Sequence, residues 1–228
     1  MNSRNVAPSR SLRQRRWRKA IARFRTLARA DGGVAAMEFV ILAPILLLVI
    51  LGFTELYMYM RAISAMEHTA FVVADTLGQA TSVTDTTATT STYNLGTMWL
   101  AATNVAAPLN LQSNGAVVIT SVCDISTQCQ SGQGSGVTTK GTPSLLWQRS
   151  APWNQSSLAT KETSTSLLPS KWPFYTGDSA VVVEVFYKYV PFSMTSAFWH
   201  GAPGVQTLYE RVYVRGRSGA PLVLNPAS

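Results

Sequence analysis

Histidine is scarce in this chain, which has only two among its 228 residues. His68 falls on the polar side of a predicted helix, and His200 follows the residues SAFW in a predicted loop. Histidine is the side chain that most readily exchanges protons near neutral pH. Because we expect both to be structural or solvent-facing, the sequence argues against an enzyme that uses histidine as its acid or base.

Common enzyme motifs are missing as well. The glycines of SGQGSG, residues 131–136, fit neither the dinucleotide-binding pattern G-x-G-x-x-G nor the Walker A pattern, and they do not join a strand to a helix. The nucleophile-elbow pattern G-x-S-x-G is absent too. We therefore interpret residues 131–136 as a flexible loop, and we expect no catalytic residue, no cofactor and no small-molecule substrate.

Cysteine is limited to Cys123 and Cys129, six residues apart in CDISTQC. No histidine or further cysteine lies close to them in the sequence, so a zinc site lacks its ligands and no metal is expected. In an oxidising compartment the two thiols would form a disulfide, whose small loop limits its stabilisation to at most about 2–3 kcal/mol. The alternative is a pair of unrelated thiols.

Acidic residues are absent from the first 30 residues, which hold ten of the nineteen lysines and arginines. After Arg61, eight basic residues balance eight acidic ones, so the net charge of +8 belongs to the N-terminal arm and no nucleic-acid-binding domain is indicated. Within the arm, residues 11–29 place apolar residues at helical spacing among arginines. They predict a helix on anionic lipid, a solvated arm that only sets orientation, or a mitochondrial transit peptide.

A long apolar run follows the arm. From Val34 to Phe53 only Glu38 is charged, and twenty helical residues span about 30 Å of hydrocarbon. The basic arm favours a cytoplasmic N-terminus, which places everything after Arg61 outside. Both segments are too long for an ordinary cleaved signal peptide. Glu55, where the run ends, is expected to reach the lipid headgroups, with a subunit contact as the alternative.

The helical pattern continues beyond the membrane. Apolar residues recur at steps of three and four from Leu56 to Leu77, which predicts one helix from about Val34 to Leu77, with Gly78 as its terminator. We divide residues 34–80 into a transmembrane part of about 34–55 and an amphipathic stem of about 56–80. The apolar stripe of the stem needs a partner surface.

The remaining sequence predicts a small β-rich head, residues 93–228. Before it, residues 81–92 are mostly Ser and Thr without apolar periodicity, and they predict a solvated linker. Residues 93–109 are weakly helical, and residues 124–141 and 150–178 are predicted to be long loops. β-branched and aromatic runs predict strands at 115–123, 142–150, 179–192 and 205–217. An antiparallel sheet packed on the stem would bury both apolar surfaces, so the predicted fold class is α+β.

The carboxylate of Glu38 is unexpected in this run, since an acid at the centre of a membrane helix costs roughly 2.5–3.5 kcal/mol. Glu38 is the fifth residue after Gly33 and is followed by Phe39, which gives G-x-x-x-x-E-F behind a basic leader. This motif resembles the processing site of type IV pilins and, more closely, of Tad-pilus pseudopilins of the TadE-like family.

The C-terminal strands resemble the same family. VVVEVFYKYVPF, residues 181–192, is similar to its V-x-V-x-Y-x-Y-x-P strand, and YVRGR, residues 213–217, is similar to its terminal arginine-containing strand. The sequence departs from the family pattern in having Phe186 before Tyr187 and a glycine between the two arginines. The resemblance covers residues 33–80 and 180–217.

The resemblance implies that a prepilin peptidase cleaves between Gly33 and Val34 on the cytoplasmic face, which makes residues 1–33 a leader. It implies a minor pseudopilin of the bacterial inner membrane with a periplasmic head, incorporated in the pilus or supporting its biogenesis, adhesion or secretion. Glu38 and Phe39 would serve assembly, with Glu38 against the new terminal amine of a neighbour.

The implied partners are membrane lipid, the prepilin peptidase, other minor and major pilins and the Tad assembly machinery, with no nucleic acid. The alternative is an unprocessed single-pass membrane protein whose outer domain binds a ligand or partner. In that case Glu38 is an acid at the cytoplasmic surface of an uncleaved anchor.

Overall fold

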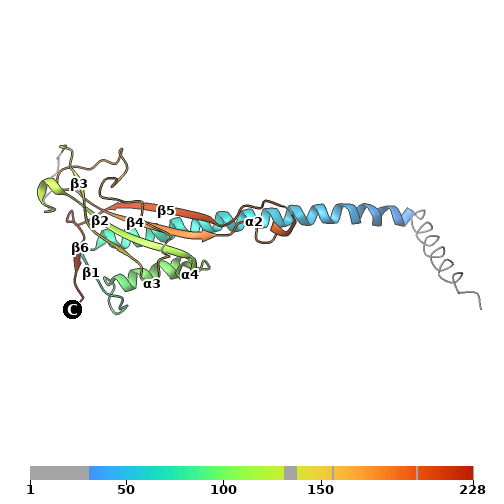
Figure 1. The fold of residues 1–228 in the computed structure, drawn as a ribbon, viewed down its shortest axis with the longest axis horizontal. Coiled ribbons are helices and arrows are strands. Elements are labelled where there is room, and N and C mark those ends of the chain that lie inside the picture. The colour runs from blue at the N-terminus through green and yellow to red at the C-terminus, as the bar shows by residue number, and fades with distance from the viewer. Residues whose placement is uncertain (1–30, 131–137, 156, 199, 228) are drawn as a thin grey trace, which may run out of the picture. The chain divides into compact units, whose positions relative to one another are not determined.

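The computed structural model describes residues 31–130, 138–155, 157–198 and 200–227, and the basic arm and the SGQGSG loop lie outside them. The chain divides into two units, residues 1–54 and residues 55–228. One helix, α2 (Asp31–Gln79), contributes to both (Figure 1). The predicted α+β class is confirmed, because this long apolar helix precedes a small antiparallel sheet.

The N-terminal part of α2 exposes its apolar side chains. Phe39 is 69% exposed, and between Val34 and Phe53 Glu38 is the only residue with a charged or hydrogen-bonding side chain. From Ala36 onward the helix is long and apolar enough to cross a membrane. An exposed apolar helix of this length fits a single-pass membrane protein.

The outer part of α2 buries one side. Met66, Ala70, Val73 and Leu77 are buried at steps of three and four residues, which confirms this part of the predicted stripe. The stripe begins later than predicted, since Leu56 is 51% exposed. The ring of Tyr59 meets that of Tyr189 at the end of strand β4 (Ser179–Tyr189), with ring centres 5.6 Å apart, and the sheet extends no further to cover Leu56.

Gly78 serves close packing and does not end the helix, which continues to Gln79. A Cβ at position 78 would lie 2.5 Å from Cγ1 of Val214. The carbonyl of Gly78 also accepts a hydrogen bond from the N–H of Arg217, at 2.8 Å. Glycine therefore lets the chain around Val214 and Arg217 approach the end of the helix.

The four predicted strands form one antiparallel sheet in the order β3-β2-β4-β5. Their bounds agree with the predicted ranges to within three residues at each end. They are β2 (Gly115–Asp124), β3 (Pro143–Ser150), β4 (Ser179–Tyr189) and β5 (Gln206–Arg215). Short connecting elements are α4 (Leu111–Asn114), η1 (Ile125–Thr127) and η2 (Ser196–Phe198).

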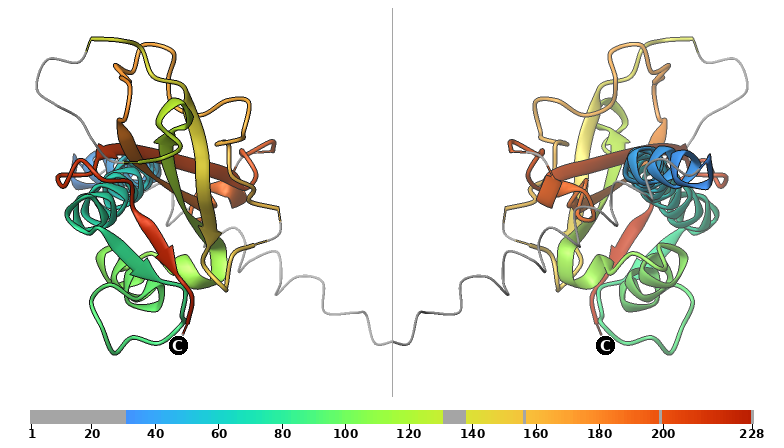
Figure 2. Two further views of the ribbon diagram at one scale, coloured as in Figure 1. Left: turned by 90° about the vertical axis from the view of Figure 1, so that its left-hand side faces the viewer. Right: turned by 90° about the vertical axis from the view of Figure 1, so that its right-hand side faces the viewer.

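Both faces of the sheet centre are covered, and every residue of β2 is buried. One face packs on α2 and on α3 (Leu95–Val105) through the alternate side chains Val117, Ile119, Val181, Val183 and Val185. The loop of residues 151–178 covers the other face, as Figure 2 shows, with Leu158, Leu167 and Phe174 buried against Ala116, Val118, Val122 and Val182. Two covered faces explain why β2 and β4 are apolar at almost every position.

A second, two-stranded sheet was not predicted. Strand β1 (Ser82–Thr84) pairs in parallel with β6 (Val223–Asn225). β1 lies in the Ser- and Thr-rich segment interpreted as a linker, and its Val83 is buried in the main core. Beside β6, the carbonyl of Leu222 accepts a hydrogen bond of 2.6 Å from the indole N–H of Trp147. The pairing joins segments far apart in the sequence, which local patterns cannot indicate.

We expect Gly78→Ala to lower the free energy of unfolding of the head by about 1–2 kcal/mol, because the added methyl group overpacks the contact with Val214. Gly52→Ala is the matched control, since a Cβ there meets nothing within 4 Å and alanine favours helix. Denaturant unfolding of the full chain in detergent, followed by tryptophan fluorescence, measures both variants. A Gly78→Ala protein as stable as the unmodified chain would contradict this packing.

Candidate functional site

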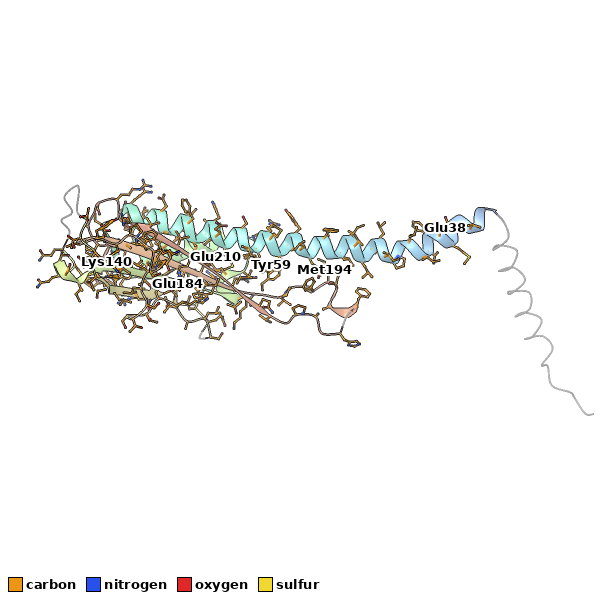
Figure 3. The ribbon with its side chains drawn as sticks, turned by 90° about the horizontal axis from the view of Figure 1, so that it is seen from above. Glu38, Tyr59, Lys140, Glu184, Met194 and Glu210 are labelled. Atoms are coloured by element: carbon orange, nitrogen blue, oxygen red, sulfur yellow. A yellow bond between two sulfur atoms is a disulfide. The ribbon has the colours of Figure 1, made fainter. Side chains whose placement is uncertain are left out.

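The G-x-x-x-x-E-F motif lies at the start of α2. Within the described residues α2 runs from Asp31, so the bond between Gly33 and Val34 lies in helix. Glu38 follows Val34 by four residues and therefore lies on the same face of the helix. Glu38 and its neighbour Phe39 are both exposed, and Figure 3 shows Glu38 near the N-terminal end of the helix.

The surroundings of Glu38 suit a charge-pairing role. In the part of the chain that the structure describes, none of the ion pairs includes Glu38. A carboxylate on an apolar, lipid-facing surface is stabilised strongly by a cation that reaches it from another molecule. Val34 on the same face is the residue whose amine cleavage after Gly33 would expose.

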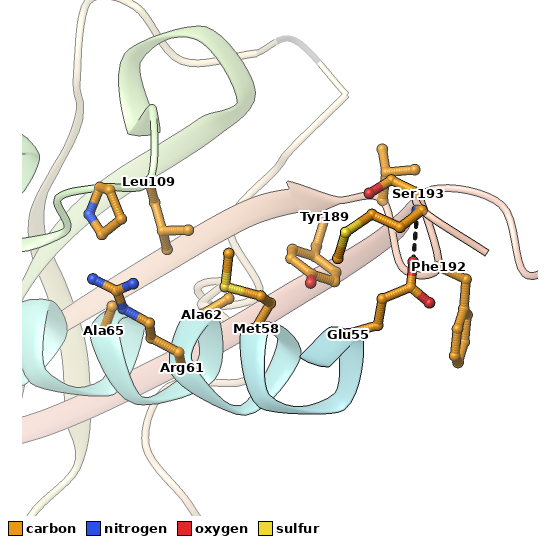
Figure 4. A pocket seen from close by; sticks show the side chains of 12 residues that line it. Glu55, Met58, Arg61, Ala62, Ala65, Leu109, Tyr189, Phe192 and Ser193 are labelled. Atoms are coloured by element: carbon orange, nitrogen blue, oxygen red, sulfur yellow. Dashed lines mark hydrogen bonds between the residues drawn. The ribbon is translucent and has the colours of Figure 1, made fainter. Parts of the chain in front are cut away.

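Glu55 has a different environment, and the expectation that it reaches lipid headgroups is wrong. The residue is only 4% exposed. Its carboxylate accepts hydrogen bonds from the N–H of Met194 at 2.6 Å, the N–H of Thr195 at 3.1 Å and the hydroxyl of Thr195 at 2.5 Å. Figure 4 shows the bond to the Met194 backbone. These donors compensate for the burial of the charge.

Two cavities lie beside Glu55. One, of about 400 Å³, is lined by apolar residues that include Met58, Ala62, Leu109 and Tyr189, with Arg61 also on its lining (Figure 4). The other, of about 490 Å³, is lined by Leu56, Tyr59, Pro191, Phe192, Pro203, Gln206 and Glu55 itself. The loop that follows β4 therefore meets α2 beside two spaces with apolar walls.

Two buried glutamates lie between the sheet and the 151–178 loop that covers it. Glu184 accepts hydrogen bonds from the N–H of Lys161 and the hydroxyl of Tyr209, both at 2.9 Å, and from the hydroxyl of Thr160. Burial and the charge of Glu184 raise the pKa of Tyr209. Every carboxylate oxygen of Glu184 thus has a donor, which attaches the 151–178 loop to β4 and β5.

Glu162 forms the second of these anchors. It accepts hydrogen bonds from Arg211 at 2.6 Å, from the hydroxyl of Tyr213 at 2.9 Å and from the N–H of Leu168 at 3.2 Å. Burial and the hydrogen bond to Glu162 raise the pKa of Tyr213. Since the tyrosines stay protonated and the glutamates stay paired, this cluster holds the loop in place.

The predicted disulfide is formed between Cys123 and Cys129. Asp124 holds the backbone of the loop that this disulfide closes. The Asp124 carboxylate accepts hydrogen bonds from the N–H groups of Gly177 at 2.7 Å, Thr142 at 2.8 Å and Ser126 at 3.1 Å. Asp124 was not among the residues predicted from the sequence, although an aspartate two residues before a serine is a common signal of such a turn.

The histidines and the acids form no metal-binding cluster among the described residues. His68 and His200 are both exposed. Within residues 31–130, 138–155, 157–198 and 200–227, no group of three His, Cys, Asp or Glu side chains could hold a metal ion. The site that stands out chemically is therefore the α2 motif, with Glu55 as a second acid on the same helix.

Comparison with known protein families places the motif in context. Residues 33–75 match the family model described as TadE-like protein. This part of the chain, the greater part of α2, is therefore similar to TadE-like proteins. Comparisons with curated proteins and with solved structures gave no match. The match begins at Gly33 and ends within the last turns of α2, so the resemblance of the C-terminal strands to this family stays a prediction.

We expect Asp124→Asn to lower the free energy of unfolding by about 1–3 kcal/mol at pH 7, because three backbone donors lose a charged acceptor. Burial by itself would raise the pKa of Asp124, but hydrogen bonds from Ser126, Gly177 and Thr142 outweigh it and lower the pKa. The stabilisation is therefore present above pH of about 4, the unfolded value, and is lost as pH falls through the lower folded value.

Unfolding measured from pH 7 to pH 2 tests this expectation, with Asp85→Asn as the matched control. Asp85 pairs with Arg149 at 2.7 Å on the surface, so its loss is expected to change stability by less than about 1 kcal/mol. An acid-induced loss of stability equal in Asp124→Asn and the unmodified protein would contradict the role given to Asp124.

Proposed function

We propose that this protein is a minor pseudopilin of a Tad-type pilus, anchored by α2 in the bacterial inner membrane with its head in the periplasm. The match of residues 33–75 to the TadE-like family carries the proposal, because it coincides with the apolar helix and starts at Gly33. TadE-like proteins are structural components of pili. The protein acts by assembly, in contact with other pilins and with the Tad machinery.

Processing is the first step of the proposed function. A prepilin peptidase removes residues 1–33 on the cytoplasmic face, and the mature chain begins at Val34 with a free amine. Support comes from the spacing of Gly33 and Glu38 and from the basic leader before them. Cleavage also removes ten basic residues, whose positive charge holds the N-terminus at the cytoplasmic surface of the membrane.

Glu38 then guides the packing of helices. In a bundle of pilin helices, water is excluded and a carboxylate needs a partner. The amine of Val34 on a neighbouring subunit is a cation of suitable position, since Val34 and Glu38 lie on one helix face and are both exposed. Each subunit thus offers one charge of each sign within about one helical turn.

We expect the membrane form from the native host to start at Val34. Intact-mass measurement and N-terminal sequencing of protein from washed membranes test this, and Gly33→Leu provides the control because a bulky residue blocks access to the bond. A retained Met1 in the unmodified protein would overturn processing and favour the unprocessed anchor with a partner-binding outer domain.

Glu38→Ala is expected to leave membrane insertion unchanged and to reduce incorporation into pili or pilus subassemblies by at least about tenfold. Loss of one partner of a buried ion pair costs about 3–5 kcal/mol, which exceeds the tenfold equivalent. Crosslinking in membranes and recovery from sheared pili measure incorporation.

The matched control is Glu67→Ala, which removes an exposed acid farther along the same helix. Normal incorporation of the Glu38→Ala protein would count against the pairing.

A further inference from the structure

The loop between β4 and β5, residues 190–198 and 200–205, lies against the point where α2 leaves its apolar run. Hydrogen bonds from Met194 and Thr195 attach the loop to Glu55. Glu55 follows Thr54 directly in the chain, so the loop is tethered at the border of the apolar run. Figure 1 shows this orange-red segment beside α2.

This loop is unusually apolar for an exposed connection. From Tyr189 to Tyr209 the sequence contains no Asp, Glu, Lys or Arg. Phe198 is 69% exposed, and three further large apolar side chains are also exposed, namely Val190, Met194 and Val205. Exposed apolar side chains gathered in one loop indicate an interaction surface.

The same tether changes the surface of the helix. With Glu55 buried under the loop, the exposed side chains of α2 from Phe39 to Met60 include no charge. If Glu38 and Glu55 both bounded the membrane span, the helix between them would cover only about 24 Å, short of a hydrocarbon core of about 30 Å. Extended to Met60, it covers about 33 Å.

The residues that follow suit the outer interface of a bilayer. Leu56, Tyr57 and Met60 are exposed, and Arg61 is the next charged residue. Aromatic side chains prefer the interface, and arginine reaches the headgroups. Arg61 also lines the apolar cavity of about 400 Å³ beside Glu55. Its guanidinium could pair with a lipid phosphate, and the cavity beside it has room for part of an acyl chain.

We propose that the β4–β5 loop inserts into the outer leaflet of the membrane that α2 spans, with lipid as its partner. Within the loop, the N–H groups of Thr195, Ser196 and Phe198 donate to the carbonyls of Phe192 and Thr195, which lowers the number of backbone groups that would lie unpaired at this depth. It removes the charge of Glu55 from the lipid-facing surface by supplying the donors itself. The proposal rests on membrane insertion of α2 but not on processing or pilus assembly.

The test uses the full chain in vesicles of phosphatidylcholine and phosphatidylglycerol. Ser196→Cys places an environment-sensitive fluorescent label on the exposed turn, and the native cysteines do not react because they form the disulfide. Ser218→Cys is the matched control, exposed beside the far end of the stem near Gly78. Lipids brominated on the acyl chain quench labels within the leaflet.

We expect quenching by these lipids to be about threefold stronger at residue 196 than at residue 218. Adding Phe198→Ser, which changes an exposed side chain and therefore leaves folding intact, is expected to remove most of the difference. Equal quenching at the two labels overturns the proposal. A label at 196 that is exposed to aqueous iodide in vesicles and protected only in the presence of other pilus subunits also overturns it, in favour of a protein partner.

Extraction at alkaline pH distinguishes a failure of membrane anchoring by α2 from a failure of loop insertion alone. If the labelled proteins are released from the vesicles, α2 does not span the membrane, and the proposed anchoring fails together with the loop insertion. If they stay in the membrane while residue 196 is not quenched, only the loop insertion fails.

Discussion

The packing of the outer half of α2 against one face of the sheet is the interaction on which the rest of the head depends. Met66, Ala70, Val73 and Leu77 fill the same core as Val117, Val183 and Val185. A four-stranded sheet of this size and a lone amphipathic helix are each unstable with their apolar surfaces in water. Their contact buries both surfaces. It also brings the end of β5 to the end of the helix, where Gly78 allows a close approach of the backbone.

Two acids on α2 show how environment decides the role of the same side chain. Glu38 is exposed among apolar side chains, a position that favours pairing with a charge from another subunit. Glu55 is buried and fully supplied with donors by Met194 and Thr195 of its own chain. In the proposed function the first acid serves assembly, whereas the second attaches a loop to the helix and is withdrawn from the exposed surface.

Much of the fold could be predicted because it rests on periodic patterns. The steps of three and four along the stem, the alternation of β4 and the apolar run before them each report a local period of the backbone. The candidate site could be proposed as well, since G-x-x-x-x-E-F is a contiguous motif that lies within the TadE-like match, while the roles of its residues stay predictions. The strands β1 and β6 escaped prediction because three-residue strands carry no period and pair across the length of the head.

Local sequence patterns were enough to predict the apolar helix, the four main strands and the cysteine pair, because each depends on neighbours within a few residues. The partners of the buried carboxylates and the close packing of Gly78 depend instead on how distant segments fold together. Glu55 finds its donors 139 and 140 residues later, Glu162 and Glu184 find theirs on β5 and in the facing loop, and Gly78 meets Val214. The stability of a buried carboxylate depends on which donors the folded chain brings within about 3 Å, and no local pattern contains that information.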